Sequence, residues 1–271
     1  MRYSEIPPSP GLKRYVKCYW ALEASHPESA GGEPVMPDGC IELIFNLAAP
    51  FRRYHSSGAV ETQPFSIVAG QMRSCAVIGP SGAIDLFGVR FRHAGASAFF
   101  SFPLNELTDR IINLDVVLGR DGRETEERLN AARTVRQRVA IIENVLFRLL
   151  SQNTGSDLMV EAATGIIVEN MGLASIDGVI DALGVNERRL ERRFQRKIGL
   201  SPKRFSRIIR FQSFLNAATA GNGRNLLDTA LLFGYYDQAH LIREFREFSG
   251  KTPLEFFERE YKLSEVFINA A

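Results

Sequence analysis

A short pattern that occurs twice in the last third of the chain constrains the fold more than any other feature of the sequence. Its first copy consists of Leu190, Phe194, Gly199 and Pro202, which recur fifty-one positions later as Leu241, Phe245, Gly250 and Pro253. Upstream of each copy, a short apolar helical pattern ends in glycine, at Gly184 and at Gly234. A repeat of this kind predicts one small structural unit that is present twice.

The order of helix, glycine turn and second helix is that of a helix-turn-helix unit. The expected helices span residues 157–171, 175–183, 187–198, 202–219, 225–233, 237–248 and 253–261. Asn186 and Asp237 are the expected N-caps of the two second, or recognition, helices. The glycines Gly199 and Gly250 suit the ends of these helices, and Pro202 and Pro253 suit the first turn of the helices that follow. Two such units suggest a chain that reads two successive stretches of a DNA major groove.

Each recognition helix has an apolar face, expected to be buried, and a polar face that could contact bases. The candidate base-reading residues are Arg188, Glu191, Arg192 and Gln195 in the first helix and Gln238, Ala239, Ile242 and Arg243 in the second. Arginine can hydrogen-bond guanine, glutamate can accept from cytosine, and glutamine can read adenine. Because Ala239 and Ile242 offer only apolar contact, the second helix should discriminate less by hydrogen bonds than the first.

Basic residues gather around the first unit, although the formal net charge of +2 is close to neutral. Between Arg188 and Arg210 the chain has ten Lys and Arg residues against one acid, Glu191. Such clustering indicates a phosphate-binding surface. The candidate phosphate-binding residues of the two units are Arg189, Lys203, Arg204, His240, Arg246, Lys251 and Thr252.

The helix expected between the two units is a spacer of about 18 residues, or roughly 27 Å. Successive major-groove faces lie about 34 Å apart along the duplex. A spacer of this length can place two recognition helices in neighbouring grooves or bend the DNA slightly.

The N-terminal part lacks long helical patterns and carries short apolar runs broken by Gly, Pro and Ser, as in β-rich domains. Strand candidates are Cys40–Leu47, Phe65–Ala69, Ala76–Ile78 and Ile84–Phe91, with Tyr15–Leu22 either a strand or a short helix. The spacing favours a sandwich or small barrel. A short helix is expected around Ala94–Phe100.

The middle of the chain is predicted to be helical, with an apolar stripe along Val135–Leu150. This helix either packs within the chain or forms a dimer contact, and the sequence leaves both interpretations open. The polar segment Ser151–Ser156 is the expected interdomain linker. The sequence therefore predicts an α+β chain with a β-rich domain (1–110), a helical connector (111–155), an all-α DNA-binding domain (156–262) and a C-terminal tail (263–271).

The segments Gly234–Phe245 and Phe248–Pro253 resemble the signature of AraC/XylS-type transcription regulators. One departure is Leu241, where an aromatic commonly follows the family's histidine. The resemblance implies a domain of about a hundred residues with two helix-turn-helix units joined by a long helix. The segments Met36–Asn46 and Phe87–Arg92 are similar, more weakly, to a sensor-type domain that precedes such domains. This second resemblance implies a cupin-like barrel at the N-terminus, but no motif fixes effector-binding residues.

Several classes of protein are disfavoured by residues that the sequence lacks. No apolar run approaches the roughly 20 residues that span a bilayer, so we expect a cytoplasmic protein without a membrane partner. Cys18, Cys40 and Cys75 are widely spaced and odd in number, which fits reduced thiols, and a redox switch stays open. His26, His55 and His93 are isolated, so no metal, cofactor or catalytic residue is expected. A cupin-type enzyme fused to a DNA-binding domain is therefore the least favoured alternative.

The expected partners follow from this interpretation. Double-stranded DNA and RNA polymerase are expected, whereas a small-molecule effector and a homodimer stay open. A constitutive DNA-binding regulator, whose N-terminal domain only dimerises, is the main alternative to an effector-controlled one.

Overall fold

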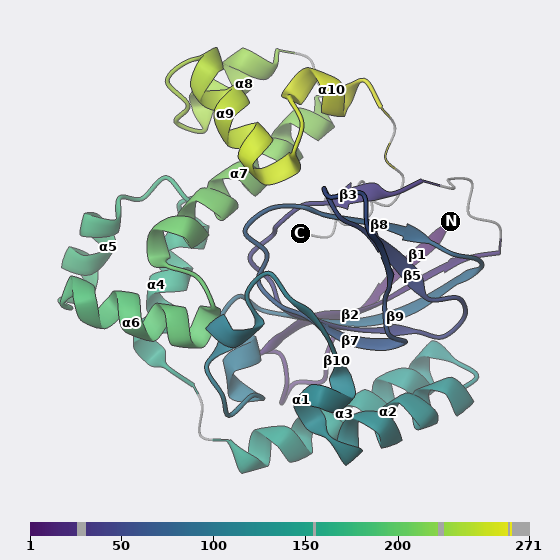
Figure 1. Ribbon diagram of the computed structural model, residues 1–271. Helices are drawn as coiled ribbons and strands as arrows, with labels where there is room; N and C mark the ends of the chain where they lie inside the picture. The colour runs from purple at the N-terminus through teal and green to yellow at the C-terminus, as the bar shows by residue number, and fades with distance from the viewer. Residues whose placement is uncertain (26–30, 154–155, 222–224, 260, 262–271) are drawn as a thin grey trace.

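The computed structural model describes residues 1–25, 31–153, 156–221, 225–259 and 261. A β-rich domain forms the N-terminal part and helices form the C-terminal part (Figure 1), which confirms the predicted α+β class. Ser151 and Gln152 of the predicted linker are the last residues of a helix. Residues 154 and 155 of that linker and the predicted tail 263–271 lie outside the described residues.

Two antiparallel sheets make up the N-terminal domain. The six-stranded sheet has the order β1-β2-β9-β4-β7-β10, and the four-stranded sheet has the order β3-β8-β5-β6. The strands are β1 (Arg2–Ile6), β2 (Val16–Ala24), β3 (Glu33–Val35), β4 (Glu42–Asn46), β5 (Phe51–Tyr54), β6 (Val60–Thr62), β7 (Ser66–Ala69), β8 (Ala76–Pro80), β9 (Ile84–Phe91) and β10 (Ile111–Asn113). The segment Tyr15–Leu22, left open by its sequence, is thus mostly strand.

Strand β9 shows how the six-stranded sheet is buried on both faces. Phe87, Val89 and Phe91 belong to a core that the sheet shares with helices, whereas Ile84 and Leu86 belong to a smaller core between the two sheets. The alternation follows the two-residue period of a strand, since successive side chains point to opposite faces. Arg90 lies four residues after Leu86, so the two side chains point to the same face of the sheet. Both line a cavity between the two sheets.

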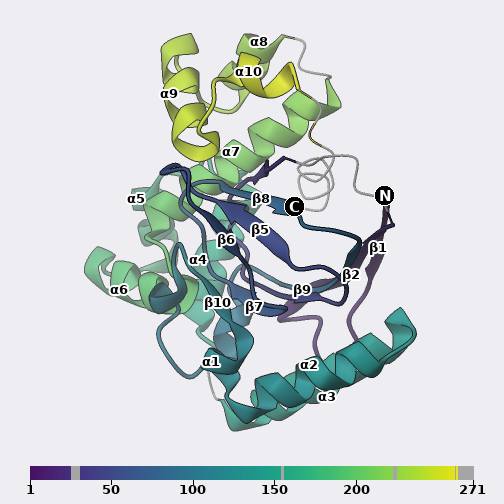
Figure 2. The same ribbon diagram turned by 45° about the vertical axis from the view of Figure 1, so that its right-hand side comes forward.

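The helices that follow the sheets cover the outer face of the six-stranded sheet (Figures 1 and 2). They are the 3-10 turns η1 (Gly95–Ala98) and η2 (Leu104–Leu107), then α1 (Leu114–Leu118), α2 (Arg120–Ala131) and α3 (Val135–Gln152). In α3, Ile142, Leu146 and Leu149 are buried in the core of that sheet. The apolar stripe of this helix is therefore packed within the chain, which was one of the two open interpretations.

The C-terminal helices agree closely with the sequence prediction. They are α4 (Leu158–Glu169), α5 (Ile176–Leu183), α6 (Glu187–Ile198), α7 (Pro202–Ala220), α8 (Leu226–Leu232), α9 (Gln238–Ser249) and α10 (Pro253–Phe257). The largest difference is α10, which ends at Phe257 rather than at 261. One apolar core spans all seven helices and includes Met36 of the β-rich domain, so the two domains share buried surface.

Candidate DNA-binding surface and interdomain cavity

The first helix-turn-helix unit consists of α5 and α6. Gly184, with a φ of +60°, ends α5 in the left-handed region, which favours glycine at a tight helix end. Asn186 then caps α6 by accepting a hydrogen bond from the backbone N–H of Arg189 at 3.3 Å. Leu190 and Phe194 are buried on the inner face of α6. The predicted cap and the predicted buried face are both confirmed.

The outer face of α6 presents most of the candidate base readers to solvent. Arg188, Arg192 and Gln195 are exposed, and Glu191 is half-buried. The amide of Gln195 donates to the Glu191 carboxylate at 3.0 Å, so these two side chains hold each other one turn apart. The face thus combines strong donors with one oriented acceptor, as base edges require.

The second unit consists of α8 and α9 and is built in the same way. Gly234, with a φ of +72°, occupies the turn, and Asp237 caps α9 by accepting from the His240 N–H at 2.7 Å. The predicted inner face of α9 is buried, through Leu241, Phe245 and Phe248. On the outer face Gln238, Ala239, Arg243 and Arg246 are exposed, and Ile242 is half-buried.

The turn before α9 carries an exposed aromatic that sequence reasoning did not single out. Tyr236 is 88% exposed, and its ring stacks on His240 with 5.8 Å between ring centroids. The Nδ1 atom of His240 lies 3.4 Å from the Tyr236 N–H, which orients the ring. The turn therefore fixes the orientation of the His240 ring. The exposed Tyr236 side chain forms part of the surface of this unit.

Part of the basic run turns away from solvent and holds α7 against α9. The buried Glu244 carboxylate accepts from Arg207 at 2.9 Å, from Arg210 at 2.8 Å and from the Tyr235 hydroxyl at 2.9 Å. Burial and the neighbouring Glu244 raise the pKa of Tyr235, so this hydroxyl stays a donor. These residues act in packing, because Arg207, Arg210 and Tyr235 all donate to the buried Glu244 carboxylate.

Arg204, a candidate phosphate-binding residue, is also engaged within the chain. Its guanidinium pairs with Glu247 and donates to the backbone carbonyl of Arg73 in the β-rich domain. The same guanidinium lies 4.6 Å from the centre of the Phe248 ring. Hydrogen bonds from Arg207 and Arg204 lower the pKa of Glu247, which therefore stays ionised as their partner. In contrast, Lys203 is exposed beside them.

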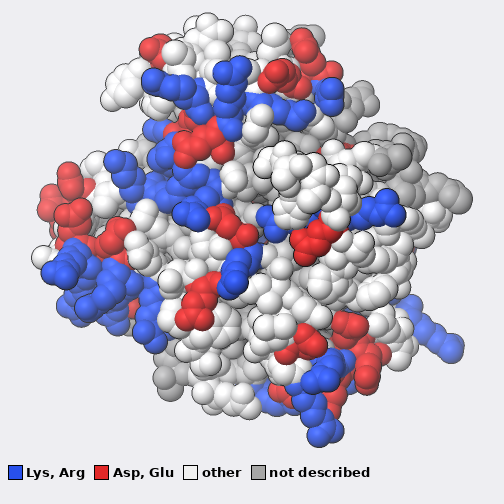
Figure 3. All heavy atoms as spheres, in the orientation of Figure 1, with Lys and Arg blue, Asp and Glu red and all other residues white. Residues whose placement is uncertain are grey.

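Figure 3 shows how basic side chains are distributed over one face of the molecule. Lys and Arg side chains gather over α6, and others lie between α6 and α9 on the same face of the molecule. Of the other candidate phosphate-binding residues, Arg189 and Arg246 are exposed, while Lys251 and Thr252 are half-buried. The two recognition helices thus contribute to one face on which basic side chains gather, with acidic side chains between α6 and α9.

Contacts from the β-rich domain reach both helix-turn-helix units. Thr108 donates to the Gly199 carbonyl at the end of α6 at 2.6 Å. The Cys75 N–H donates to the Phe248 carbonyl near the end of α9 at 2.7 Å. The β-rich domain therefore touches the C-terminal end of each recognition helix and can influence their relative placement.

A third contact involves α7, the helix between the two units. The loop Met36–Cys40 lies against α7, where the Gln212 amide donates to the Pro37 carbonyl at 2.7 Å. Gly39 has a φ of +76°, and a Cβ atom there would lie 2.9 Å from the Phe205 ring. The glycine is needed for both its backbone conformation and the close approach.

The cavity between the two sheets lies directly behind this loop. Centres of water-sized molecules can occupy about 100 Å³ of it. Its walls are mainly apolar, through residues such as Trp20, Ile44, Phe51 and Leu86, and Gln212 of α7 also lines it. The cavity is thus bounded by both domains.

Three charged side chains stand at one end of the cavity. Arg90 Nε lies 2.5 Å from Glu42 Oε1, and Arg90 Nη2 lies 3.4 Å from Asp38 Oδ2. Burial raises the pKa of Glu42, an effect that the Arg90 guanidinium opposes. This cluster could not be predicted from the sequence, since its members come from a loop and two strands that are distant along the chain.

Within the described ranges, no group of three or more His, Cys, Asp or Glu side chains could hold a metal ion. Cys18, Cys40 and Cys75 are free thiols. Cys40 Sγ lies 3.6 Å from His93 Nδ1, and His55 pairs with Glu61, whereas His26 falls outside the described residues. None of the helices in these ranges is long and apolar enough to cross a membrane.

Two family models match the chain. A model described as a helix-turn-helix domain matches residues 179–259, and a domain of unknown function matches residues 4–113. No curated protein matches the chain.

Solved structures of one protein of Vibrio cholerae have a fold similar to that of this chain. The structure of ToxT at 1.65 Å resolution is 8% identical, with a TM-score of 0.50, and the match covers 88% of this chain and 98% of that one. A ToxT structure bound to (E)-4-(8-methylnaphthalen-1-yl)but-3-enoic acid is 11% identical, with a TM-score of 0.48 and coverage of 88% and 98%. At these identities, the first match shows a shared fold.

Proposed function

We propose that the chain, whose residues 179–259 match a helix-turn-helix domain, is an AraC-type transcription regulator that reads two adjacent major-groove segments of DNA. The observation that carries this proposal is the matched construction of α6 and α9. Each is the second helix of its unit, has a side-chain N-cap and presents exposed polar residues opposite a buried apolar face. Two such helices on one basic face favour a single duplex that contacts both.

The proposed base contacts are those of the two exposed faces: Arg188, Glu191, Arg192 and Gln195 on α6, and Gln238, Ala239, Ile242 and Arg243 on α9. The proposed phosphate contacts are Arg189, Lys203, Arg204, His240, Arg246, Lys251 and Thr252. Among these, Arg204 must leave Glu247 and the Arg73 carbonyl before it can bind a phosphate. DNA binding by Arg204 is therefore proposed to compete with its contact to the β-rich domain.

The length of α7 supports a site that spans adjacent grooves. Its 19 residues correspond to about 28 Å of helix, against about 34 Å between successive major-groove faces. The length of α7 is thus shorter than the distance between the two groove faces. The width of the recognition helices or a modest bend of the duplex can make up this difference.

We further propose that an effector in the cavity controls DNA binding. The cavity is supported as the effector site by its apolar walls and few polar groups, which are typical of small-molecule sites. Gln212 lines it and belongs to the helix between the two units, so an occupant would contact the DNA-binding domain directly. RNA polymerase is the proposed protein partner of such a regulator.

Binding of the full chain to duplex DNA tests the DNA-binding proposal. Fluorescence anisotropy would compare a duplex selected from a random library with a scrambled duplex of equal length, across a range of salt concentrations. We expect the selected duplex to bind on the order of 10³-fold more tightly or better. Affinity should fall steeply with salt, because phosphate contacts release counterions.

A matched pair of variants makes this test specific to the basic face. Lys203→Ala should reduce the magnitude of the salt slope by about 1, whereas Arg120→Ala on α2 should leave it unchanged. Equal affinity for the selected and scrambled duplexes would contradict sequence-specific reading.

A further inference from the structure

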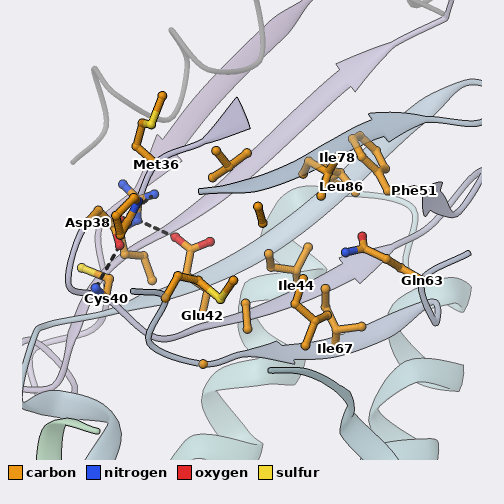
Figure 4. A pocket seen from close by; sticks show the side chains of 18 of the residues that line it. Met36, Asp38, Cys40, Glu42, Ile44, Phe51, Gln63, Ile67, Ile78 and Leu86 are labelled. Carbon is orange, nitrogen blue, oxygen red and sulfur yellow. Dashed lines mark hydrogen bonds and ion pairs between the residues drawn. The ribbon is translucent and has the colours of Figure 1, made fainter. Parts of the chain in front are cut away.

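The cavity between the two sheets has two chemically different ends, which Figure 4 shows together. Asp38, Cys40 and Glu42 stand at one end, and the apolar side chains of Ile44, Ile78, Leu86 and Phe51 extend towards the other, where the uncharged amide of Gln63 also stands. An occupant that matches this arrangement has a polar head group and an apolar body.

The charges that face the cavity are mainly negative. One guanidinium, that of Arg90, is shared by two carboxylates, those of Asp38 and Glu42. The Arg90 side chain is 3% exposed, whereas Asp38 retains 19% and Glu42 retains 12%. An occupant therefore meets carboxyl oxygens before it meets the guanidinium, and the cluster holds two carboxyl groups for one guanidinium.

A second acceptor lies at the same end, on the helix from the other domain. Gln212 is buried, its Nε2 atom is committed to the Pro37 carbonyl, and its Oε1 atom has no hydrogen-bond partner. A buried acceptor without a donor costs free energy, so a donor from the occupant would be favoured there. Both the carboxylates and this amide oxygen thus call for hydrogen-bond donors.

From these contacts we propose that the cavity binds a small apolar amine, with its ammonium group at Asp38, Glu42 and Gln212 and its hydrocarbon part among the isoleucines. The proposal rests on the proposed function, since it names the chemical class of the effector at that site. An ammonium group supplies donors to several acceptors and brings a second positive charge to the two carboxyl groups. Arg90 Nη1 also has no hydrogen-bond partner, so an acceptor oxygen next to the amine would complete the head group.

The same contacts indicate how such an amine would act on the DNA-binding domain. The Gln212 amide that meets the ammonium also holds the Pro37 carbonyl, and Pro37 belongs to the loop that packs on α7. Occupancy would therefore strengthen or shift the contact between this loop and α7, and with it the placement of the two recognition helices.

Three probes with equal hydrocarbon chains test the ligand class on the full chain: hexylamine, 1-hexanol and hexanoate. We expect hexylamine to raise the melting temperature most, because a ligand of the native state stabilises it in proportion to its affinity. Titration calorimetry should then give an affinity for hexylamine that falls roughly tenfold in Glu42→Gln, which removes the charged acceptor. The matched control is Glu124→Gln on the surface of α2, which should bind hexylamine as the wild type does.

A second variant covers the case in which Glu42→Gln does not fold. Gln212→Leu is similar in size but removes both the acceptor and the Nε2 donor to the Pro37 carbonyl, and it should also weaken hexylamine binding. Preference for hexanoate over hexylamine, or hexylamine binding that neither variant weakens, would overturn the proposal. So would the failure of hexylamine to bind.

A DNA-binding readout separates this proposal from the proposed function. If hexylamine binds in the cavity but leaves affinity for the selected duplex unchanged, the ligand class stands and effector control is wrong. If hexanoate binds and changes DNA affinity, effector control stands and the amine class is wrong.

Discussion

Gly39 shows at the scale of one residue how the β-rich domain meets the DNA-binding domain. Its φ of +76° lies in the region that favours glycine, and a Cβ atom added there would lie 2.9 Å from Phe205 and 3.4 Å from Ile209 of α7. A side chain here would pay a backbone cost and would also push the loop Met36–Cys40 away from the helix. The backbone cost alone can be measured at Gly58, which has a φ of +85° and no atom within 4 Å of an added Cβ.

We therefore predict that Gly39→Ala destabilises the fold more than Gly58→Ala does. Gly58→Ala should cost about 1–2 kcal/mol for the left-handed backbone. Gly39→Ala should lose about 1–3 kcal/mol more, because the methyl group overpacks the interface. Free energies of unfolding from urea titrations would show the difference. Equal losses in the two variants would mean that the loop does not press on α7.

At the scale of elements, the pairing of α7 with α9 depends on one buried acid. The Glu244 side chain is 2% exposed and is bound by Arg207, Arg210 and Tyr235, whereas Glu247 one turn later is 42% exposed. Removing a buried partner leaves the other charges uncompensated, but an exposed ion pair contributes little because water screens it.

Glu244→Gln should accordingly reduce the free energy of unfolding by about 3 kcal/mol, the lower end for a buried ion pair since both arginines are partly exposed. Glu247→Gln should cost less than about 1 kcal/mol. The two variants make the same chemical change one turn apart, so chemical denaturation of both gives a direct comparison. If Glu247→Gln lowered the free energy of unfolding as much as Glu244→Gln does, the buried Glu244 would not be the main acid that holds α7 against α9.

The elements that the sequence predicted best are those with strong local signals. The bounds of α6 and β9 match their predictions, because α6 has a side-chain cap, an apolar stripe and a terminal glycine, and β9 is a long apolar run. The short strands β3, β5, β6 and β10 were not predicted. They have three or four residues each, and pairing with neighbouring strands rather than local pattern defines them.

The basic run shows the same limit within the candidate site. Sequence spacing placed the polar faces of α6 and α9 outward, as the structure has them. It could not show that Arg204, Arg207 and Arg210 turn towards acids of α9, since their partners lie some forty residues away. A charge cluster predicts a surface, whereas tertiary contacts decide which of its members stay free to bind phosphate.

At the scale of the whole molecule, the β-rich domain contacts both recognition helices and the long helix between the two units. Thr108 meets the end of α6, Cys75 meets the end of α9, and the loop Met36–Cys40 meets α7. The cavity lies behind that loop. It could not be predicted from the sequence, because its walls come from many separate segments. This arrangement supports a regulator in which an occupied cavity sets the spacing of two DNA-reading helices.

The central claim, that both recognition helices read bases in one continuous site, is tested most directly by selection from randomised duplexes. The full chain, Arg192→Ala and Arg243→Ala would each be used to select sites, which are then sequenced. Loss of an arginine–guanine contact costs about 1–3 kcal/mol of discrimination at one base pair. We predict a two-part site for the wild type, with base preference relaxed in one part by Arg192→Ala and in the other by Arg243→Ala. Unchanged preferences in both variants would contradict the account, because those side chains would then grip only the backbone.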